Sequence, residues 1–411
     1  MIQTNDLRRS SFKWVLVFLA LCGREVPTSY GADDSSIATM DELKFTAPKE
    51  KGRVELVDGQ MGKAVQFSFD KDGSGKFATS NIRGTPAWDQ AAGFSFWVKG
   101  DGSDAWGGLE VIYDDDYAVR YDYMFPIKSK QWTKVVVAWQ DLIPVLPGPK
   151  ARTLNPSGEN RPSKLSGLWF GKWWYWSEYP AHSFVIDEIR LETDIPRDAT
   201  DYTSSHPPLQ RVLEKLKSGR PVTIVTLGDS LTDFRHWANR TVSWPNLLRD
   251  ELHQKYKSEV TIVNRAIGGT QLTQNLVLMP RWLERSPNPD LVLICFGGND
   301  WDAGMRGPMF LEANLDAIDR VRRATKGKAD VLLMSTIPSA TRWDVTAELS
   351  EACRKATVTA KSGLADTEKA FLDAGKSDKN RLFVDDRVHL SPAGHKLVVK
   401  TILQAIEDAS R

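Results

Sequence analysis

The sequence predicts two folded domains, an all-β sandwich followed by an α/β domain whose parallel sheet is covered by helices. At 411 residues, the chain is long enough for each domain to bury its own core. In the first half, short runs of alternating apolar and polar residues are separated by turn clusters such as 70–75, as in antiparallel sheets. From Pro221 onward, apolar runs of strand length alternate with helical patterns, as in parallel sheets.

Residues 1–32 resemble a secretory signal peptide. Arg8, Arg9 and Lys13 supply a positive charge before the apolar run 14–21, which is too short to span a bilayer comfortably. A retained membrane anchor is the alternative interpretation. We therefore expect an exported protein, periplasmic or secreted, with no membrane span in its mature chain.

The composition argues against nucleic acid as a partner and against a bound metal. The 54 Lys and Arg residues nearly balance the 53 Asp and Glu residues, whereas proteins that bind nucleic acid usually carry a basic patch. Of the three cysteines, Cys22 lies in the predicted signal, and Cys295 and Cys353 are interpreted as buried thiols. Because no Cys/His cluster has the spacing of metal ligands, we predict no metal and no cofactor.

The β-sandwich is expected over residues 33–198, and most of the 15 tryptophans lie there. Trp173, Trp174 and Trp176 belong to an aromatic block in which strand alternation would leave some rings exposed. Exposed aromatic rings stack on sugar faces, so these three are candidate substrate-binding residues, with core or seam packing as the alternative. The expected strands are 64–69, 93–98, 132–137, 167–170 and 184–191.

A polar linker over 199–219, with a short helix at 209–218, leads into the α/β domain at 220–411. There the apolar runs predict strands, and the longer amphipathic runs between them predict helices. The expected strands are 222–227, 260–264, 291–296 and 331–335, and the expected helices are 244–256, 276–285, 310–325, 347–360 and 392–407.

Ser230 follows the first of these parallel strands, where ligands bind in open α/β sheets. A serine hydroxyl is a weak nucleophile until a base takes its proton. His389 is the natural base because imidazole titrates near neutral pH. Asp386, three residues earlier, can accept the other ring N–H and orient the imidazole.

An oxyanion site can be assembled from three donors at element ends: the backbone N–H groups of Ser230 and Gly269 and the carboxamide of Asn299.

His395 is a rival base, but it lies inside the last expected helix and is assigned to packing. Asp233 and His236 repeat the Asp-x-x-His spacing, yet a helix starting at Ser230 would carry them away from the nucleophile.

Four short blocks together resemble the SGNH hydrolases, also called GDSL esterases or lipases. The defining Ser, Gly, Asn and His correspond to Ser230, Gly269, Asn299 and His389, with Asp386 as the triad acid. The resemblance implies a flavodoxin-like three-layer domain and ester hydrolysis without a metal. The blocks are Gly228-Asp229-Ser230-Leu231, Asn264 to Gly269, Gly297-Gly298-Asn299-Asp300 and Asp386-Arg387-Val388-His389.

The first domain resembles the galactose-binding-like jelly rolls of carbohydrate-binding modules through its last strand, 184–191. The pair of resemblances implies an esterase that removes acetyl groups from a polysaccharide or oligosaccharide ester. A lipase or thioesterase of the same fold, and an inactive carbohydrate-binding protein, are the alternatives. Tryptophans near the blocks favour a ring-bearing substrate: Trp237, Trp343 and especially Trp301.

Overall fold

The computed structural model describes residues 35–48, 52–71, 76–147, 152–173, 175, 180–286 and 288–409. The predicted signal peptide, Trp174 and Trp176 lie outside these residues. Within them, no helix combines the length and the apolar character needed to cross a membrane.

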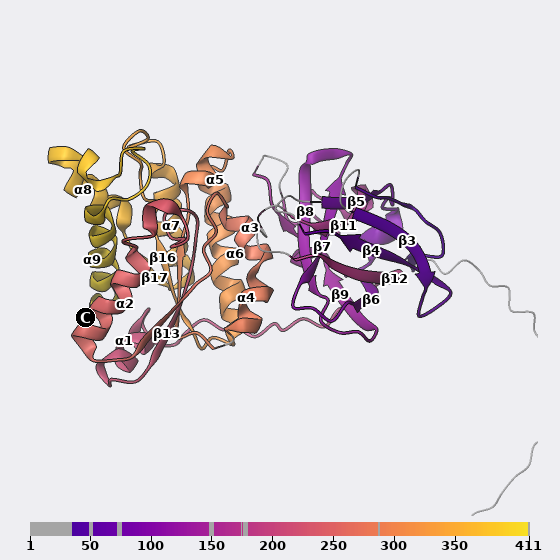
Figure 1. Ribbon diagram of the computed structural model, residues 1–411, viewed down its shortest axis with the longest axis horizontal. Helices are drawn as coiled ribbons and strands as arrows, with labels where there is room; N and C mark the ends of the chain where they lie inside the picture. Colours follow the sequence, from indigo (N-terminus) through magenta and orange to yellow (C-terminus); the bar gives the residue numbers. More distant parts are fainter. Residues whose placement is uncertain are drawn as a thin grey trace, which may run out of the picture. The chain divides into compact units, whose positions relative to one another are not determined.

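The described part of the first domain consists of two antiparallel sheets, which confirms the predicted sandwich (Figure 1). One sheet has the order β3 (Gly52–Asp58), β4 (Lys63–Phe69), β12 (His182–Glu192), β6 (Gly93–Gly100) and β9 (Thr133–Ala138), with β1 (Ser36–Ala38) also paired to β12. The other has the order β10 (Ile143–Pro144), β8 (Asp116–Pro126), β7 (Trp106–Tyr113), β11 (Leu165–Lys172), β5 (Lys76–Ser80) and β2 (Phe45–Thr46).

Phenylalanine rings from both sheets form the core of the sandwich. Phe67 and Phe184 stack with their centroids 5.5 Å apart, and Phe96 meets Phe125 edge-on at 5.1 Å. Phe170 of β11 faces Phe96 of the opposite sheet and Phe125 of its own sheet, and it is fully buried. Because side chains alternate across a strand, the apolar positions of each run point inward together.

The second domain is built on a parallel sheet whose described strands have the order β14 (Val260–Asn264), β13 (Val222–Gly228), β15 (Leu291–Cys295), β16 (Asp330–Met334) and β17 (Gly363–Ala365). The four predicted strands are therefore confirmed to within one or two residues. Figure 1 shows the strands between two groups of helices. The helices are α1 (Gln210–Lys217), α2 (Trp244–Tyr256), α3 (Leu272–Val277), α4 (Met279–Arg285), α5 (Gly298–Asp302), α6 (Gly307–Thr325), α7 (Ala347–Ala360), α8 (Thr367–Asp378) and α9 (Pro392–Asp408).

Both faces of this sheet are buried. On β15, Leu291 and Leu293 pack into a cluster with residues of α1, α2, α8 and α9. Their neighbours Val292 and Ile294 belong to a second cluster with residues of α3, α4, α6 and α7. Continuous apolar strands of this kind are typical of parallel sheets covered on both sides, and they confirm the three-layer arrangement.

Three details differ from the sequence expectations. The helix expected at 276–285 is two helices, because Pro280 lies in the first turn of α4, where its missing N–H disrupts no bond. Strand β17 was not expected, since three residues are too few to show a period. No helix begins at Ser230; turns lead instead to a short 3₁₀ helix at Trp237–Asn239.

Candidate active site

The residues assigned to catalysis follow the carboxyl ends of three neighbouring strands. Ser230 comes two residues after β13, Gly269 lies in the turn after β14, and Asn299 lies in α5 just after β15. Asp386 and His389 come from the loop before α9, whose first turn is capped by the Ser391 hydroxyl. Parallel strands end at the same edge of a sheet, so these segments meet there.

The structure brings Ser230, His389 and Asp386 into one hydrogen-bonded chain. His389 Nε2 lies 2.9 Å from Ser230 Oγ, and His389 Nδ1 lies 2.6 Å from Asp386 Oδ2. The other carboxylate oxygen of Asp386 accepts the backbone N–H groups of Val388 and His389, each at 2.9 Å. This arrangement is the one that serine hydrolysis requires of a nucleophile, a base and an orienting acid.

The charge of Asp386 follows from its surroundings. Partial burial raises the pKa of its carboxyl, but the hydrogen bonds from His389 and Val388 outweigh burial, and the net pKa lies below the usual value. The carboxylate therefore stays ionised at neutral pH and accepts from His389 Nδ1. Because Nδ1 keeps its proton in this hydrogen bond, the neutral imidazole has an unprotonated Nε2, which faces Ser230.

The oxyanion donors can be assigned from backbone contacts. The N–H of Gly268 is taken, because it donates to Asp233 Oδ2 at 3.2 Å. Gly269 has a φ of +80°, and its N–H, like that of Ser230, makes no hydrogen bond within the described ranges. A β-carbon built on Gly268 would lie 3.6 Å from Ser230 Cβ, so the turn packs beside the nucleophile. Gly269, not Gly268, is thus the available donor.

Asn299 is held by the turn that contains Gly268 and Gly269. Its Nδ2 donates to the carbonyl of Thr270 at 3.1 Å and lies 3.5 Å from Asp229 Oδ2. A carboxamide nitrogen carries two hydrogens, and the contact with Asp229 is too long to hold the second one firmly. Asn299 can therefore donate to an oxyanion while it remains anchored.

Two buried acids beside the site were missed by the sequence reasoning. Burial raises the pKa of Asp229 to about 6 and that of Asp300 to about 7. Asp300 accepts the N–H groups of Leu272 at 2.9 Å and Gly297 at 3.1 Å, which joins the starts of α3 and α5. Their positions next to Ser230 and Asn299 in the blocks were the available signal.

The expectation that His236 lies away from the nucleophile is wrong. Its ring stacks on His389, with centroids 4.1 Å apart and planes 25° apart. The reason is that the chain turns after Ser230 instead of forming a helix. The Asp233 carboxylate nevertheless does not orient the His236 ring, because it accepts from the Arg235 guanidinium and the Gly268 N–H.

His395 has the packing role that was expected. It is buried in α9, and its Nδ1 accepts the backbone N–H of Trp244 at 3.1 Å, which links α9 to α2. Burial lowers the pKa of its imidazole to about 4, so it is neutral near pH 7. It does not contact Ser230.

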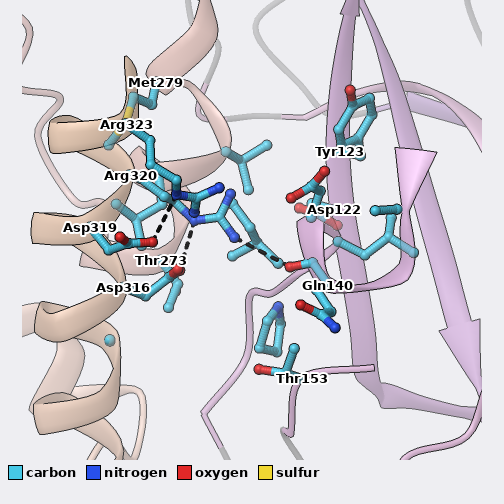
Figure 2. Close-up of a pocket in the computed structure, with 18 of the residues that line it drawn as sticks. Asp122, Tyr123, Gln140, Thr153, Thr273, Met279, Asp316, Asp319, Arg320 and Arg323 are labelled. Atoms are coloured by element: carbon cyan, nitrogen blue, oxygen red, sulfur yellow. Dashed lines mark hydrogen bonds and ion pairs between the residues drawn. The ribbon is translucent and has the colours of Figure 1, made fainter. Parts of the chain in front are cut away.

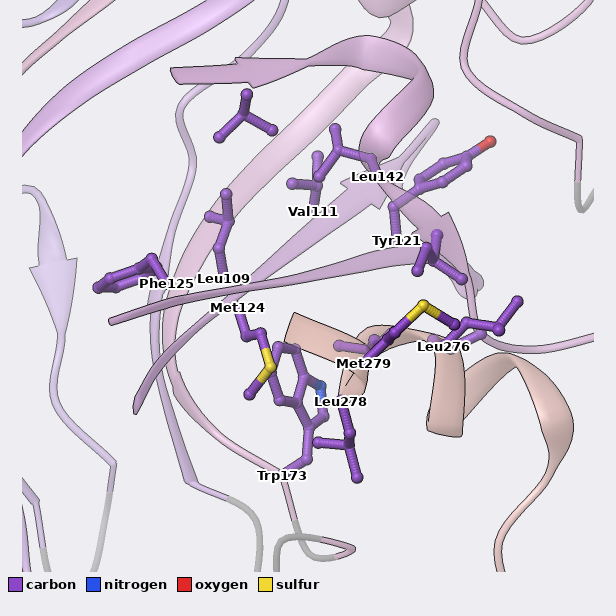
Figure 3. Close-up of a cluster of buried hydrophobic side chains, with 14 of the residues drawn as sticks. Leu109, Val111, Tyr121, Met124, Phe125, Leu142, Trp173, Leu276, Leu278 and Met279 are labelled. Atoms are coloured by element: carbon purple, nitrogen blue, oxygen red, sulfur yellow. The ribbon is translucent and has the colours of Figure 1, made fainter. Parts of the chain in front are cut away.

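Of the candidate substrate-binding tryptophans, Trp173 differs from the expectation, and Trp174 and Trp176 lie outside the described residues. Trp173 is only 5% exposed, and its Nε1 donates to Glu110 Oε2 at 3.2 Å. Figure 3 shows it among buried apolar side chains that include Met124 and Leu278, so it has no free face for a sugar. Trp301 is partly buried, and the Arg306 guanidinium lies 3.8 Å above its ring.

Trp237 instead has the exposed indole near the nucleophile. It is 56% exposed, and its ring centroid lies 5.8 Å from that of His389. Two further apolar side chains are exposed nearby: Phe234, in the loop that carries Trp237, and Val388, in the loop that carries His389. The loops around Ser230 thus expose aromatic and apolar side chains among charged ones, which include Arg235, Asp385 and Arg387.

A cavity of about 1000 Å³ lies apart from this site, and Ser230 and His389 do not line it. Its lining includes Asp122 of β8, Gln140, and Arg320 and Arg323 of α6 (Figure 2). Both arginines are paired with acids of the same helix, and Arg320 also donates to the Gln140 carbonyl.

In the described part of the chain, no group of three His, Cys, Asp or Glu residues could hold a metal ion.

Residues 226–397 match the model of the GDSL-like Lipase/Acylhydrolase family. The protein named thioesterase 1/protease 1/lysophospholipase L1 from Escherichia coli strain K12 is 33% identical over 125 residues, which are 30% of this chain and 55% of that protein. The chain thus spans about half the length of this curated relative. The counterpart from E. coli O6:H1 matches equally.

Solved structures match about half of the chain at lower identity. Axe2, an acetylxylan esterase from Geobacillus stearothermophilus, is 22% identical with a TM-score of 0.39, covering 46% of this chain and 96% of that one. A two-domain esterase (CEX) active on acetylated mannans is 22% identical with a TM-score of 0.41, covering 50% and 54%. A GDSL-like lipase from Parabacteroides merdae is 18% identical, with a TM-score of 0.40 and coverage of 46% and 96%.

Proposed function

We propose that this protein is an exported serine esterase that removes O-acetyl groups from a carbohydrate, since residues 226–397 match the GDSL-like Lipase/Acylhydrolase family. The observation that carries the proposal is the hydrogen-bonded chain from Ser230 Oγ through His389 to Asp386. It is a complete proton path for acyl transfer, and free oxyanion donors lie beside it.

In the first step, Ser230 Oγ attacks the acyl carbon while His389 Nε2 takes the hydroxyl proton. The carbonyl oxygen becomes an oxyanion, which the N–H groups of Ser230 and Gly269 and the Asn299 carboxamide stabilise. The tetrahedral intermediate collapses, and His389 gives the proton to the leaving alcohol. Asp386 remains ionised and stabilises the imidazolium in between.

In the second step, water replaces the alcohol. His389 takes a proton from the water as its oxygen attacks the acyl-enzyme, and the same oxyanion donors act again. Collapse of the second intermediate breaks the bond to Ser230 Oγ and releases the carboxylic acid, and His389 returns its proton to Ser230. No redox change and no further reactant are needed.

The carbohydrate substrate is proposed from Trp237. A flat indole that is 56% exposed and lies beside His389 can stack on a sugar ring whose acetyl group reaches Ser230. A second function is hydrolysis of acyl lipids or thioesters. The thioesterase/lysophospholipase relative and the exposed Phe234 and Val388 side chains favour this second function.

One panel of substrates tests both functions. Purified protein and Ser230→Ala are assayed on acetylated xylan, on p-nitrophenyl acetate, butyrate and palmitate, and on palmitoyl-CoA. We expect kcat/KM to be highest on acetyl esters, and Ser230→Ala to lose at least about 10³-fold in kcat while remaining folded. Activity that rises with chain length would support the second function. No ester hydrolysis by the folded protein would refute both.

A further inference from the structure

His389 is held at two ring atoms by the hydrogen bonds to Asp386 and Ser230, at Nδ1 and Nε2. Both contacts lie at the edge of the ring, so neither supports its face. A contact on the face of the ring would resist tilting of the imidazole out of line with its two partners. The stacked ring of His236, 4.1 Å away, is such a contact.

The position of His236 is tied to the nucleophile. Asn239 is buried, and its Nδ2 donates to the carbonyls of Ser230 at 2.7 Å and Asp233 at 2.8 Å. The N–H of His236 donates to the same Asp233 carbonyl at 3.0 Å. The loop that carries Ser230 therefore also fixes the ring that covers His389.

The charge of His236 suits this place. Burial first, and then the charges of His389 and Arg240, lower the pKa of its imidazole against the opposing effect of Asp233 and Asp386. His236 is thus a neutral ring at neutral pH. A neutral aromatic face is attracted to the imidazolium that forms on His389 during proton transfer, whereas a second cation would repel it.

We propose that His236 is a positioning residue for His389. It supplies a flat neutral surface that keeps the imidazole in line between Ser230 and Asp386 while the proton moves. The proposal rests on the serine-esterase function above. It assigns His236 no bond to the substrate and no proton of its own.

The test compares His236→Ala, which removes the stack, with His236→Phe, which keeps a flat ring without nitrogen atoms. His206→Ala, at an exposed histidine outside the site, is the matched control. On p-nitrophenyl acetate we expect His236→Ala to lose about 10- to 100-fold in kcat with KM within about twofold. His236→Phe should stay within about threefold of wild type in kcat, and His206→Ala should match wild type.

Two results would overturn the proposal. Equal losses in the Phe and Ala variants would mean that an imidazole nitrogen takes part in the reaction. Full activity of His236→Ala, or a change in its KM alone, would mean that the stack does not position the base. Thermal unfolding of each variant identifies loss of fold, and His236→Phe still tests the stack if His236→Ala does not fold.

A second readout separates this proposal from the proposed function. A fluorophosphonate labels an activated serine by forming the Oγ–P bond and releasing fluoride, without any need for an ester substrate. If no ester is hydrolysed, the esterase function fails, but the labelling rate of Ser230 still ranks the variants. We expect slow labelling of His236→Ala and near wild-type labelling of His236→Phe; equal rates for all three proteins would refute the positioning role.

Discussion

Asp386 accepts two hydrogen bonds from His389, one from ring Nδ1 at 2.6 Å and one from the backbone N–H at 2.9 Å. The two bonds use different carboxylate oxygens, so the acid fixes the ring and the main chain of the base together. Arg387 between them has a φ of +62°, which marks the tight turn that this contact closes. The geometry of the base is therefore a local property of a four-residue segment.

Asp386→Asn should abolish most activity without unfolding the protein. The amide oxygen can still accept the backbone N–H groups, but the amide nitrogen would face Nδ1 and force the proton onto Nε2, next to Ser230. With no base available, kcat should fall by about 10³- to 10⁴-fold, as the wrong tautomer does in other serine triads. Steady-state kinetics and thermal unfolding measure the two effects; more than a tenth of wild-type kcat would contradict this role of Asp386.

Asn299→Ala should remove one oxyanion donor. We expect kcat to fall by about 10²- to 10³-fold with a smaller change in KM, because the donor acts on charge that develops in the transition state. The variant also loses the hydrogen bond to Thr270, so its unfolding temperature must be measured beside its kinetics. A larger effect on KM than on kcat would place Asn299 in ground-state binding instead.

Gly297→Ala should destabilise the domain, whereas Gly298→Ala should not. Gly297 has a φ of +141°, and a β-carbon there would lie 2.2 Å from Thr336 Oγ1. Strain of this kind costs on the order of 1–3 kcal/mol, before any repacking. A β-carbon at Gly298 would meet no atom within 4 Å. Urea unfolding of the two variants gives the comparison, and equal stabilities would contradict it.

Trp237→Ala should weaken activity only on the carbohydrate ester. Loss of a stacked indole should lower kcat/KM on an acetylated xylo-oligosaccharide by about tenfold, the equivalent of about 1.4 kcal/mol. Activity on p-nitrophenyl acetate should stay within about threefold. Trp301→Ala, whose ring is covered by Arg306, is the control. Equal losses on both substrates would indicate that Trp237 supports His389 and does not bind sugar.

Asp229 should make the free energy of unfolding fall as the pH rises. Its folded pKa of about 6 exceeds the ordinary value of 3.8, so its contribution is fully present below about pH 4 and lost as the pH rises through 6. The contribution of Asp229 to the free energy of unfolding that is lost in this way is on the order of 3 kcal/mol. Urea unfolding of Asp229→Asn between pH 4 and 8 should show a flatter profile than wild type or the exposed control Asp250→Asn. Parallel profiles would refute the assignment.

Much of the candidate site could be predicted from local patterns. Apolar runs locate the ends of β13, β14 and β15, and Ser230, Gly269 and Asn299 follow those ends within a few residues. Asp386 and His389 are close in sequence, so their pairing needs no long-range information. In the described structure, Ser230, His389 and Asp386 form one hydrogen-bonded chain, and Asn299 is tied to the turn after Gly269.

The surroundings of the site could not be predicted in this way. The path of the chain after Ser230 decides where His236 goes, and it depends on Asp233, whose carboxylate accepts the N–H of Gly268 in the turn after β14. The burial of Trp173 likewise depends on side chains far away in the sequence. Alternation along a strand tells which residues share a face, but not what covers that face.

Periodicity in the amino-acid sequence thus determined the two domain classes and the strand ends, and the four short blocks indicated Ser230, His389 and Asp386 as the candidate nucleophile, base and acid. The tertiary structure decided three further matters: that the Gly268 N–H donates to Asp233, that His236 covers His389, and that Trp237 is exposed whereas Trp173 is buried. All three depend on which N–H groups already donate hydrogen bonds and which surfaces other segments already cover. Only the folded chain brings those segments together.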